Sequence, residues 1–413
     1  MEEGSKEEWP CTEGPGEKDG AMARNAAREL DIILHGATGY TGQLVAEYIQ
    51  AHLPESLSWG LSGRSTAKLA AVRDAIGAPA DLPLIVADSA DPASVKALAE
   101  RASVVITAAG PYQLYGGDLV AACAAAGTDY LDLCGEPAWM AEMIPAHQAA
   151  AEASGARILF SSGFDSIPFD LGVRFLQDRA VERFGAPLEQ VHGRVRALRG
   201  TFSGGTAASA GATAAAASRD PAVLARILDP FSLTPGFQGP AQPDDRKPHE
   251  DPATGSWVAP FMMAPINTKN VHRTNFLLGH PYGQDFRYDE MLMTGPGEQG
   301  QRAAEAAAAQ RGLGGRPLKP GEGPTPEERE AGFYDLLFVG KTADGRTLRA
   351  SVKGDRDPGY GSTCKILSET AFLLFETPRD QLAGGIWTPA AALGQPLVER
   401  LEAKAGLRFA IED

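Results

Sequence analysis

The sequence has few cysteines, and their placement excludes two common frameworks. Of its 413 residues, four are cysteine, and none of these forms a C-x-x-C pair or has histidines nearby at zinc-ligand spacing. They are Cys11, Cys123, Cys134 and Cys364. Because isolated thiols are typical of reducing compartments, we expect a cytoplasmic protein with neither a disulfide scaffold nor a bound metal.

Long apolar runs and an excess of positive charge are also missing. No stretch approaches the ~20 consecutive apolar residues of a membrane-spanning helix, and the alanine-rich run SAGATAAAAS is interpreted as a helix in water. The formal net charge is -15, from 53 acidic and 38 basic residues. An acidic chain disfavours nucleic acid and anionic membranes as partners, so we expect small-molecule ligands.

Two kinds of low-complexity segment punctuate the chain. Residues 1–27 carry an excess of acidic side chains among glycines and prolines, which predicts a disordered acidic tail. Prolines crowd residues 229–260, and glycines and prolines crowd residues 311–328, which predicts long surface loops. The remaining length is enough for two domains.

From residue 30 onward, short apolar runs alternate with amphipathic stretches. The runs predict strands at 30–36, 57–63, 82–88, 103–110, 129–136 and 157–160. The stretches between them predict helices at 41–53, 65–77, 91–102 and 116–127. This order predicts an α/β fold, a Rossmann-type doubly wound parallel sheet over residues 28–165.

After that point the alternation ends. A turn in KTADGRT between two alternating apolar runs predicts a β-hairpin over 335–354. We therefore expect an inserted α+β domain at 166–360, which binds substrate or forms a homodimer contact. Amphipathic stretches at 362–378 and 389–406 predict that residues 361–413 return to the first domain as helices.

Glycines at 36, 39 and 42 follow the first predicted strand and open the first predicted helix. In that context Gly36 allows a tight turn, Gly39 lets the backbone approach a pyrophosphate, and Gly42 allows close helix packing. The G-x-x-G-x-x-G spacing is one residue longer than the commoner fingerprint. Candidate cofactor contacts in this loop are Gly36, Ala37, Thr38, Gly39, Tyr40, Thr41 and Gly42.

The residues at the end of the second strand indicate which of the two nicotinamide cofactors is bound. A carboxylate there binds the ribose 2′-hydroxyl of NAD, but this strand ends in SGRSTAKL. Arg64, Ser65 and Lys68 offer a guanidinium, a hydroxyl and a second cation, which favours the 2′-phosphate of NADP. Asp88 ends the third strand, where it would contact the adenine or cap the following loop.

The fourth strand ends in AAGPYQLYGG, whose backbone is expected to lie beside the cofactor. Tyr112 and Tyr115 follow, and a protonated tyrosine can donate a proton or hydrogen bond to a developing oxyanion. Packing of both rings within the loop is the alternative. Further candidate cofactor contacts are Ala109, Gly110, Pro111 and Gly135.

The fifth and sixth strands end in CGEP and SSGFDSIPFDLG. Their polar residues Glu136, Asp165 and Ser166 would face the same crevice, with helix capping and turn formation as the alternative roles. Asp165 joins the two tyrosines in the candidate catalytic set. The seven histidines are dispersed and suggest no metal site.

Several of these segments together resemble one family. HGATGYTG, SGRSTAKL, AAGPYQLYGG, YLDLCGEP and SGFDSIPFDLG are similar to the saccharopine dehydrogenase-like oxidoreductases. DPGYGSTCKILSE and GGIWTPAAALGQPLVERL resemble the mycobacterial trans-acting enoyl reductase branch. The resemblance implies an NADP-linked Rossmann domain with an inserted domain, and a role in lipid metabolism.

Three activities stay open. The enoyl reductase branch implies reduction of a carbon–carbon double bond in a lipid or polyketide-type substrate. A saccharopine-type amino-acid oxidoreductase would need clustered arginines for its carboxylates, and HGRVRALRG supplies Arg194, Arg196 and Arg199, of which only the first two share a strand face. The third reading is a non-catalytic NADP-binding sensor or lipid-associated protein.

Overall fold

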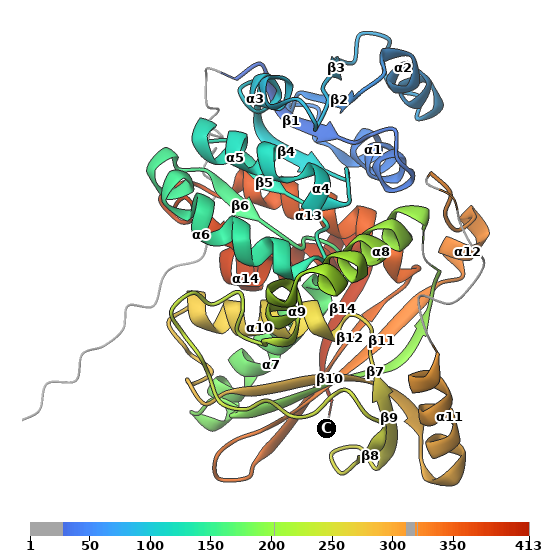
Figure 1. The fold of residues 1–413 in the computed structure, drawn as a ribbon, viewed down its shortest axis with the longest axis vertical. Coiled ribbons are helices and arrows are strands. Elements are labelled where there is room, and N and C mark those ends of the chain that lie inside the picture. The colour runs from blue at the N-terminus through green and yellow to red at the C-terminus, as the bar shows by residue number, and fades with distance from the viewer. Residues whose placement is uncertain (1–27, 202, 311–318, 320, 413) are drawn as a thin grey trace, which may run out of the picture.

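The computed structural model describes residues 28–201, 203–310, 319 and 321–412. The acidic tail predicted for residues 1–27 lies outside this part of the chain. Two seven-stranded sheets form the molecule, the first in the upper half of Figure 1 and the second in the lower half. No helix in the described residues is long and apolar enough to cross a membrane.

The first sheet is entirely parallel, as the alternating sequence pattern predicts. Its strands are β1 (Leu30–His35), β2 (Trp59–Gly63), β3 (Leu84–Val86), β4 (Ala102–Thr107), β5 (Asp129–Leu131), β6 (Arg157–Leu159) and β13 (Gly385–Trp387). They lie in the order β13-β6-β5-β4-β1-β2-β3. The order reverses beside β1, so this is a doubly wound Rossmann-type sheet and the fold prediction is confirmed.

Helices cover both faces of this sheet. They are α1 (Tyr40–His52), α2 (Thr66–Ala75), α3 (Pro92–Ala99), α4 (Tyr112–Tyr115), α5 (Gly117–Ala126), α6 (Pro137–Ser154) and α13 (Thr363–Glu376). One apolar core contains residues of α1, α2 and α13, and another contains residues of α3, α5 and α6. The strands between the two cores are buried on both faces, which is why they read as continuous apolar runs.

Local capping explains where these helices begin. Asp91 accepts a hydrogen bond of 3.0 Å from the amide of Ala93, and Pro92 stands at the first helical position of α3. Ser65 does the same at α2, where its hydroxyl accepts from the amide of Lys68. Side-chain oxygens there satisfy amides that have no partner within the helix.

The second sheet is mixed. Its strands are β7 (Gln190–Arg199), β8 (His249–Asp251), β9 (Ser256–Pro260), β10 (Arg287–Gly295), β11 (Phe333–Lys341), β12 (Thr347–Gly354) and β14 (Leu407–Glu412). Their order is β14-β12-β11-β7-β10-β9-β8, with β7 parallel to β10 and the other neighbours antiparallel. The hairpin predicted over 335–354 is β11 and β12, while α7 (Ile167–Phe184) packs against the sheet.

Two parts of the chain differ from the prediction. Residues 229–260, predicted as a loop, contain β8 and β9, because Pro248 precedes β8, Pro252 lies in the turn and Pro260 ends β9, so the paired residues of this hairpin contain no proline. The C-terminal segment contains β13 and β14 in addition to α13 and α14 (Pro389–Arg400). Strand β13 pairs with β6 in the first sheet, as the predicted return to that domain requires. Strand β14 instead pairs with β12, so it belongs to the second sheet.

A polar helix lies between the two sheets. Helix α10 (Ala264–Leu277) is buried over most of its length, yet its buried residues include asparagines, threonines, a lysine and an arginine. Arg273 donates to the carbonyl oxygen of Ile386 in β13, and Asn267 donates to Glu290 in β10. The side chains of α10 therefore hydrogen-bond to both sheets, which satisfies groups that would be costly to bury unpaired.

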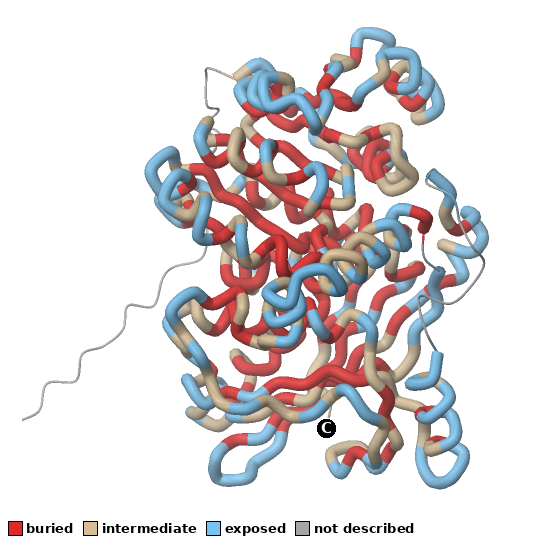
Figure 2. Tube along the Cα trace, in the orientation of Figure 1, coloured by how far each residue is buried: buried red, intermediate tan, exposed pale blue. Residues whose placement is uncertain are grey.

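Two helices lie at the surface over the space between the sheets. They are α8 (Gly204–Arg219) and α9 (Pro221–Leu228). Figure 2 shows both as mainly exposed or intermediate, and Gly204 is the only buried residue of the two. The alanine-rich run is thus a helix in contact with solvent, and its inner side closes a cavity.

Candidate functional site

A cavity of about 860 Å³ lies at the carboxyl ends of the first sheet's strands. Its lining begins at the glycine loop and the end of β2, passes the ends of β4, β5 and β6, and finishes under α8 and α9. In open α/β sheets, ligands bind at this edge, where the strand order reverses.

The glycine loop has the shape of a phosphate cradle. Gly36 has φ +78°, and a Cβ there would lie 2.9 Å from the amide nitrogen of Ala109. A Cβ on Gly42 would lie 2.2 Å from the carbonyl oxygen of Gly36, so both positions need glycine to close the turn. Gly39 precedes α1 without a side-chain cap, which leaves amides of the first turn free for an anion.

The loop residues divide into those that face the cavity and those that shape it. The cavity is lined by Gly36, Thr38, Gly39, Tyr40 and Thr41. Ala37 and Gly42 are buried behind them and do not line it. Ala37 and Gly42 would therefore affect a bound cofactor only indirectly, because they set the conformation of the loop.

At the end of β2, Arg64 differs from its two predicted companions. Its side chain is exposed, lines the cavity, and has no hydrogen bond or ion pair with the described residues. Ser65 and Lys68 do not line the cavity, because Ser65 caps α2 and Lys68 lies on its exposed side. Arg64 alone of the three is placed to bind a ligand in the cavity.

Beside Arg64 the cavity wall contains a neutral histidine that the sequence pattern did not single out. His35 ends β1, with Nδ1 3.0 Å from Ser62 Oγ and Nε2 2.8 Å from Ser89 Oγ. Burial lowers the pKa of His35 to about 4, so the ring is uncharged at neutral pH. Asp88 also lines the cavity, but one of its oxygens accepts from the amide of Ala90 and caps the loop.

The three candidate catalytic residues all line this one cavity. The Tyr112 hydroxyl donates to the carbonyl oxygen of Thr107 and accepts from the amide of Leu133, so both of its roles are already filled. Tyr115 stands at the rim and is 44% exposed. Asp165 has no hydrogen-bonding partner among the described residues, and burial raises the pKa of its carboxyl to about 6.

The remaining predicted contacts lie near these residues. Ala109, Gly110 and Gly135 line the cavity, whereas Pro111 does not. Glu136 accepts from the amides of Tyr112 and Gln113, at 3.0 and 2.8 Å, so it caps α4.

The part of the cavity under α8 and α9 is lined mainly by small and apolar residues, and it comes from segments that the sequence pattern did not connect with a site. Helix α8 presents a row of small residues to it, and α9, the segment before α10 and the first turn of α10 add larger apolar side chains. These residues are Gly205, Thr206, Ser209, Ala210, Thr213, Ala214, Ala217, Leu224, Ile227, Met262, Met263 and Ile266. The alanine-rich run was the available signal, since small side chains leave room beside a helix.

Comparisons with known proteins decide the family. Residues 32–159 match the model of the saccharopine dehydrogenase NADP binding domain. Over 404 residues, 91% of this chain and 96% of the relative, the chain is 40% identical to a Mycobacterium tuberculosis protein whose name places it among trans-acting enoyl reductases. The chain belongs to the trans-acting enoyl reductase family. With an NADP-binding domain of this type, it is an NADP-dependent oxidoreductase.

Other relatives agree with this membership. The trans-acting enoyl reductase of Mycobacterium bovis BCG is 38% identical over 405 residues, and that of Mycobacterium ulcerans is 37% identical over 407, each covering 91% of this chain and 96% of the relative. The apo saccharopine dehydrogenase (L-Glu forming) of Saccharomyces cerevisiae shares the fold, with a TM-score of 0.52 at 12% identity, covering 93% of this chain and 100% of that chain.

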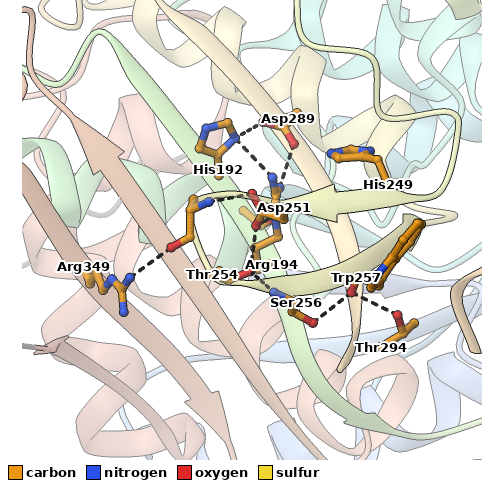
Figure 3. Close-up of polar contacts among 12 residues, drawn as sticks. His192, Arg194, His249, Asp251, Thr254, Ser256, Trp257, Asp289, Thr294 and Arg349 are labelled. Carbon is orange, nitrogen blue, oxygen red and sulfur yellow. Dashed lines mark hydrogen bonds and ion pairs between the residues drawn. The ribbon is translucent and has the colours of Figure 1, made fainter. Parts of the chain in front are cut away.

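In this member of the trans-acting enoyl reductase family, the arginines of β7 do not face the cavity, and two of them form ion pairs within the second sheet. Arg194 is 1% exposed, and its guanidinium lies 2.9 Å from Asp251 and 2.7 Å from Asp289. Figure 3 shows Arg194 in contact with both acidic side chains. Arg196 pairs with Asp335 and Glu412, and Arg199 is exposed outside the cavity. None of the three lines the cavity, so they do not form a carboxylate site there.

Proposed function

We propose that the chain is an NADPH-dependent enoyl reductase that reduces an activated carbon–carbon double bond of a lipid or polyketide-type acyl substrate. The observation that carries this proposal is the charge distribution along the cavity. Among the described lining residues, Arg64 at the cofactor end is the only arginine or lysine, and the part under α8 and α9 is formed mainly by small and apolar side chains. Such a space suits an acyl chain.

The same distribution argues against an amino-acid substrate. A saccharopine-type oxidoreductase has to hold several carboxylates, which are normally bound by arginine forks. Here Arg194 and Arg196 are neutralised by acidic partners within the second sheet. A carboxylate placed under α8 would have no cationic partner in the described lining.

The cofactor part of the proposal assigns each end of the dinucleotide to residues that fit it. The free amides after Gly39 would bind the pyrophosphate, and Arg64 the 2′-phosphate. Ala109, Gly110 and Gly135 would lie along the ribose and nicotinamide. Bound NADPH supplies a hydride, which goes to the β-carbon of the substrate.

The chain's own residues would then manage the negative charge that appears on the substrate. We assign the proton for the α-carbon to Asp165, because it lines the cavity and has no hydrogen-bond partner among the described residues. Its raised pKa places it near the range in which a carboxyl can donate a proton at neutral pH. Tyr115, at the rim, would contact the substrate as it enters.

Two further elements of the proposal concern the protein in the cell. The described cysteines Cys123, Cys134 and Cys364 are free and buried, which fits the expected cytoplasmic location. A homodimer contact through the second domain stays a prediction.

The test is oxidation of NADPH by 2-enoyl thioesters of increasing chain length, compared with a keto acid and an amino acid offered together. We expect turnover with the thioesters, rising with chain length. Ala217→Trp, which fills the apolar part of the cavity, should lower kcat/KM for thioesters with long acyl chains and leave kcat/KM for short ones unchanged. Ala208→Trp, on the outer side of α8, is the control and should leave kcat/KM unchanged for both. Turnover only with the amino-acid mixture would establish the alternative, and tight NADPH binding without any turnover would point to a sensor.

A further inference from the structure

Tyr360 comes from the DPGYGSTCK segment and lines the cavity next to Tyr40, the first residue of α1. Its ring is 3% exposed and packs edge-on against Tyr40, with ring centroids 5.2 Å apart. Asp357, fully buried, accepts hydrogen bonds from the amides of Tyr360 and Gly361. The backbone and ring of Tyr360 are therefore fixed by the fold.

The hydroxyl of Tyr360 is held at the start of α8. The amide of Ser203 donates to it, and Thr206 Oγ1 lies 2.8 Å away. A phenolic hydroxyl has two lone pairs and one hydrogen. When Thr206 is also a donor, both lone pairs are occupied and the hydrogen of Tyr360 remains for a molecule in the cavity.

This setting strengthens the hydroxyl as a donor. A hydrogen bond accepted by an oxygen polarises its own O–H bond. The positive end of the α8 dipole and the Ser203 amide also favour negative charge on the phenolic oxygen. Burial raises the pKa of Tyr360 above its ordinary value, so the hydrogen is present at neutral pH.

We propose that Tyr360 is a catalytic residue that donates a hydrogen bond to the substrate's thioester carbonyl oxygen. This inference rests on the proposed enoyl reduction. As the hydride reaches the β-carbon, the electron pair of the double bond moves toward the carbonyl and the oxygen becomes an enolate. Tyr360 stabilises that oxygen and keeps its proton, while the α-carbon takes its proton from Asp165, which water then reprotonates.

The assignment separates two tasks between two neighbouring groups. Asp165 is close enough to Tyr360 that its charge contributes to the raised pKa of the tyrosine. Tyr360 has the fixed orientation that an oxyanion donor needs, and Asp165 has the free carboxyl that a proton donor needs. Tyr112 cannot donate in the same way, because its hydroxyl hydrogen is already given to the carbonyl oxygen of Thr107.

The first experiment compares Tyr360→Phe and Thr206→Val with the wild type in NADPH oxidation by a 2-dodecenoyl thioester of N-acetylcysteamine. Tyr360→Phe should lower kcat by about 100- to 1000-fold, the usual loss for one oxyanion donor, without changing KM or the Kd for NADPH. Thr206→Val should cost about five- to tenfold, as for one neutral hydrogen bond. Tyr282→Phe is the matched control, because the Tyr282 hydroxyl is buried with no hydrogen-bond partner among the described residues and lies outside the cavity.

The second experiment does not depend on turnover. The saturated thioester, labelled with carbon-13 at its carbonyl, is bound together with NADP, and its carbonyl stretch is recorded by infrared difference spectroscopy. The wild type should shift this band to lower frequency, and Tyr360→Phe should abolish the shift. The role of Tyr360 is overturned if Tyr360→Phe keeps full activity, or if its carbonyl band is shifted as far as in the wild type. If the wild type reduces no enoyl thioester, the proposed function fails instead, and the band still reports whether Tyr360 binds the carbonyl.

Discussion

Asn267 Nδ2 donates a hydrogen bond of 2.7 Å to Glu290 Oε1, and this contact joins α10 to the interior side of β10. Tyr288 donates to the other oxygen of the same carboxyl at 2.9 Å. Glu290 is fully buried, and burial raises its pKa to about 8, above the ordinary value for a glutamate. The carboxyl therefore holds a proton more tightly in the folded protein than in the unfolded chain.

This relationship predicts a pH-dependent stability. The stabilisation from the proton on Glu290 is fully present below its unfolded pKa and is lost as the pH rises through about 8. The stability of the wild type relative to Glu290→Gln should therefore fall between about pH 5 and about pH 9. Urea unfolding of both proteins across this range measures it, and a difference independent of pH would contradict the prediction.

Arg64 is expected to select the cofactor. Arg64→Ala should weaken NADPH binding about ten- to a hundredfold and leave NADH binding nearly unchanged, because only the 2′-phosphate loses a charge-assisted hydrogen bond. Fluorescence titration with both cofactors measures the effect. Lys96→Ala, which removes an exposed cation outside the cavity, is the control. An equal loss for NADPH and NADH would mean that Arg64 does not bind the 2′-phosphate.

Two glycines of the same loop should respond differently to substitution. Gly39→Val should keep the protein folded and abolish dinucleotide binding, because the nearest atom to a Cβ there is 3.4 Å away and the side chain would occupy the space of the phosphates. Gly42→Ala should lose both stability and binding, because its Cβ would overlap the Gly36 carbonyl oxygen. Thermal unfolding and calorimetric titration separate the two outcomes. Normal NADPH binding by Gly39→Val would remove the loop from the site.

Arg194 should matter for stability and not for ligands. Arg194→Met leaves the buried carboxylates of Asp251 and Asp289 without their partner, which typically costs about 3–5 kcal/mol of unfolding free energy. NADPH affinity of the folded fraction should be unchanged. Arg199→Ala, an exposed neighbour on the same strand, should have little effect on either quantity. A specific loss of substrate binding in Arg194→Met would revive the carboxylate role.

The sequence predicts the first sheet well because its strands are buried on both faces and its helices carry capping signals such as Asp91 and Pro92. It does not predict α10, whose buried face is polar and has no helical hydrophobic period; the reason is that partners such as Glu290 and Ile386 are distant in sequence. Helix α6 was missed as well, and it contains Pro145 in its interior.

The residues of the candidate site also fall into two groups, those that the sequence indicates and those that it does not. The positions of Gly36, Gly39, Arg64 and Asp165 follow from strand ends that the alternation marks, so the sequence indicates them. Tyr360 reaches the cavity only because its segment folds back beside the start of α8, and no local pattern encodes that meeting. Ser65 and Lys68 share the right segment with Arg64, but helix capping turns them away from the cavity.

Both sheets take an outer strand from the end of the chain, β13 beside β6 and β14 beside β12. During synthesis, the first sheet can therefore reach its final width only after β13 has left the ribosome, and the second only after β14 has done so. Until then β6 and β12 present unpaired edges, which are the places where a nascent chain is most prone to pair with another copy. Removing β14 should thus lower the yield of folded protein, although it removes no residue of the cavity.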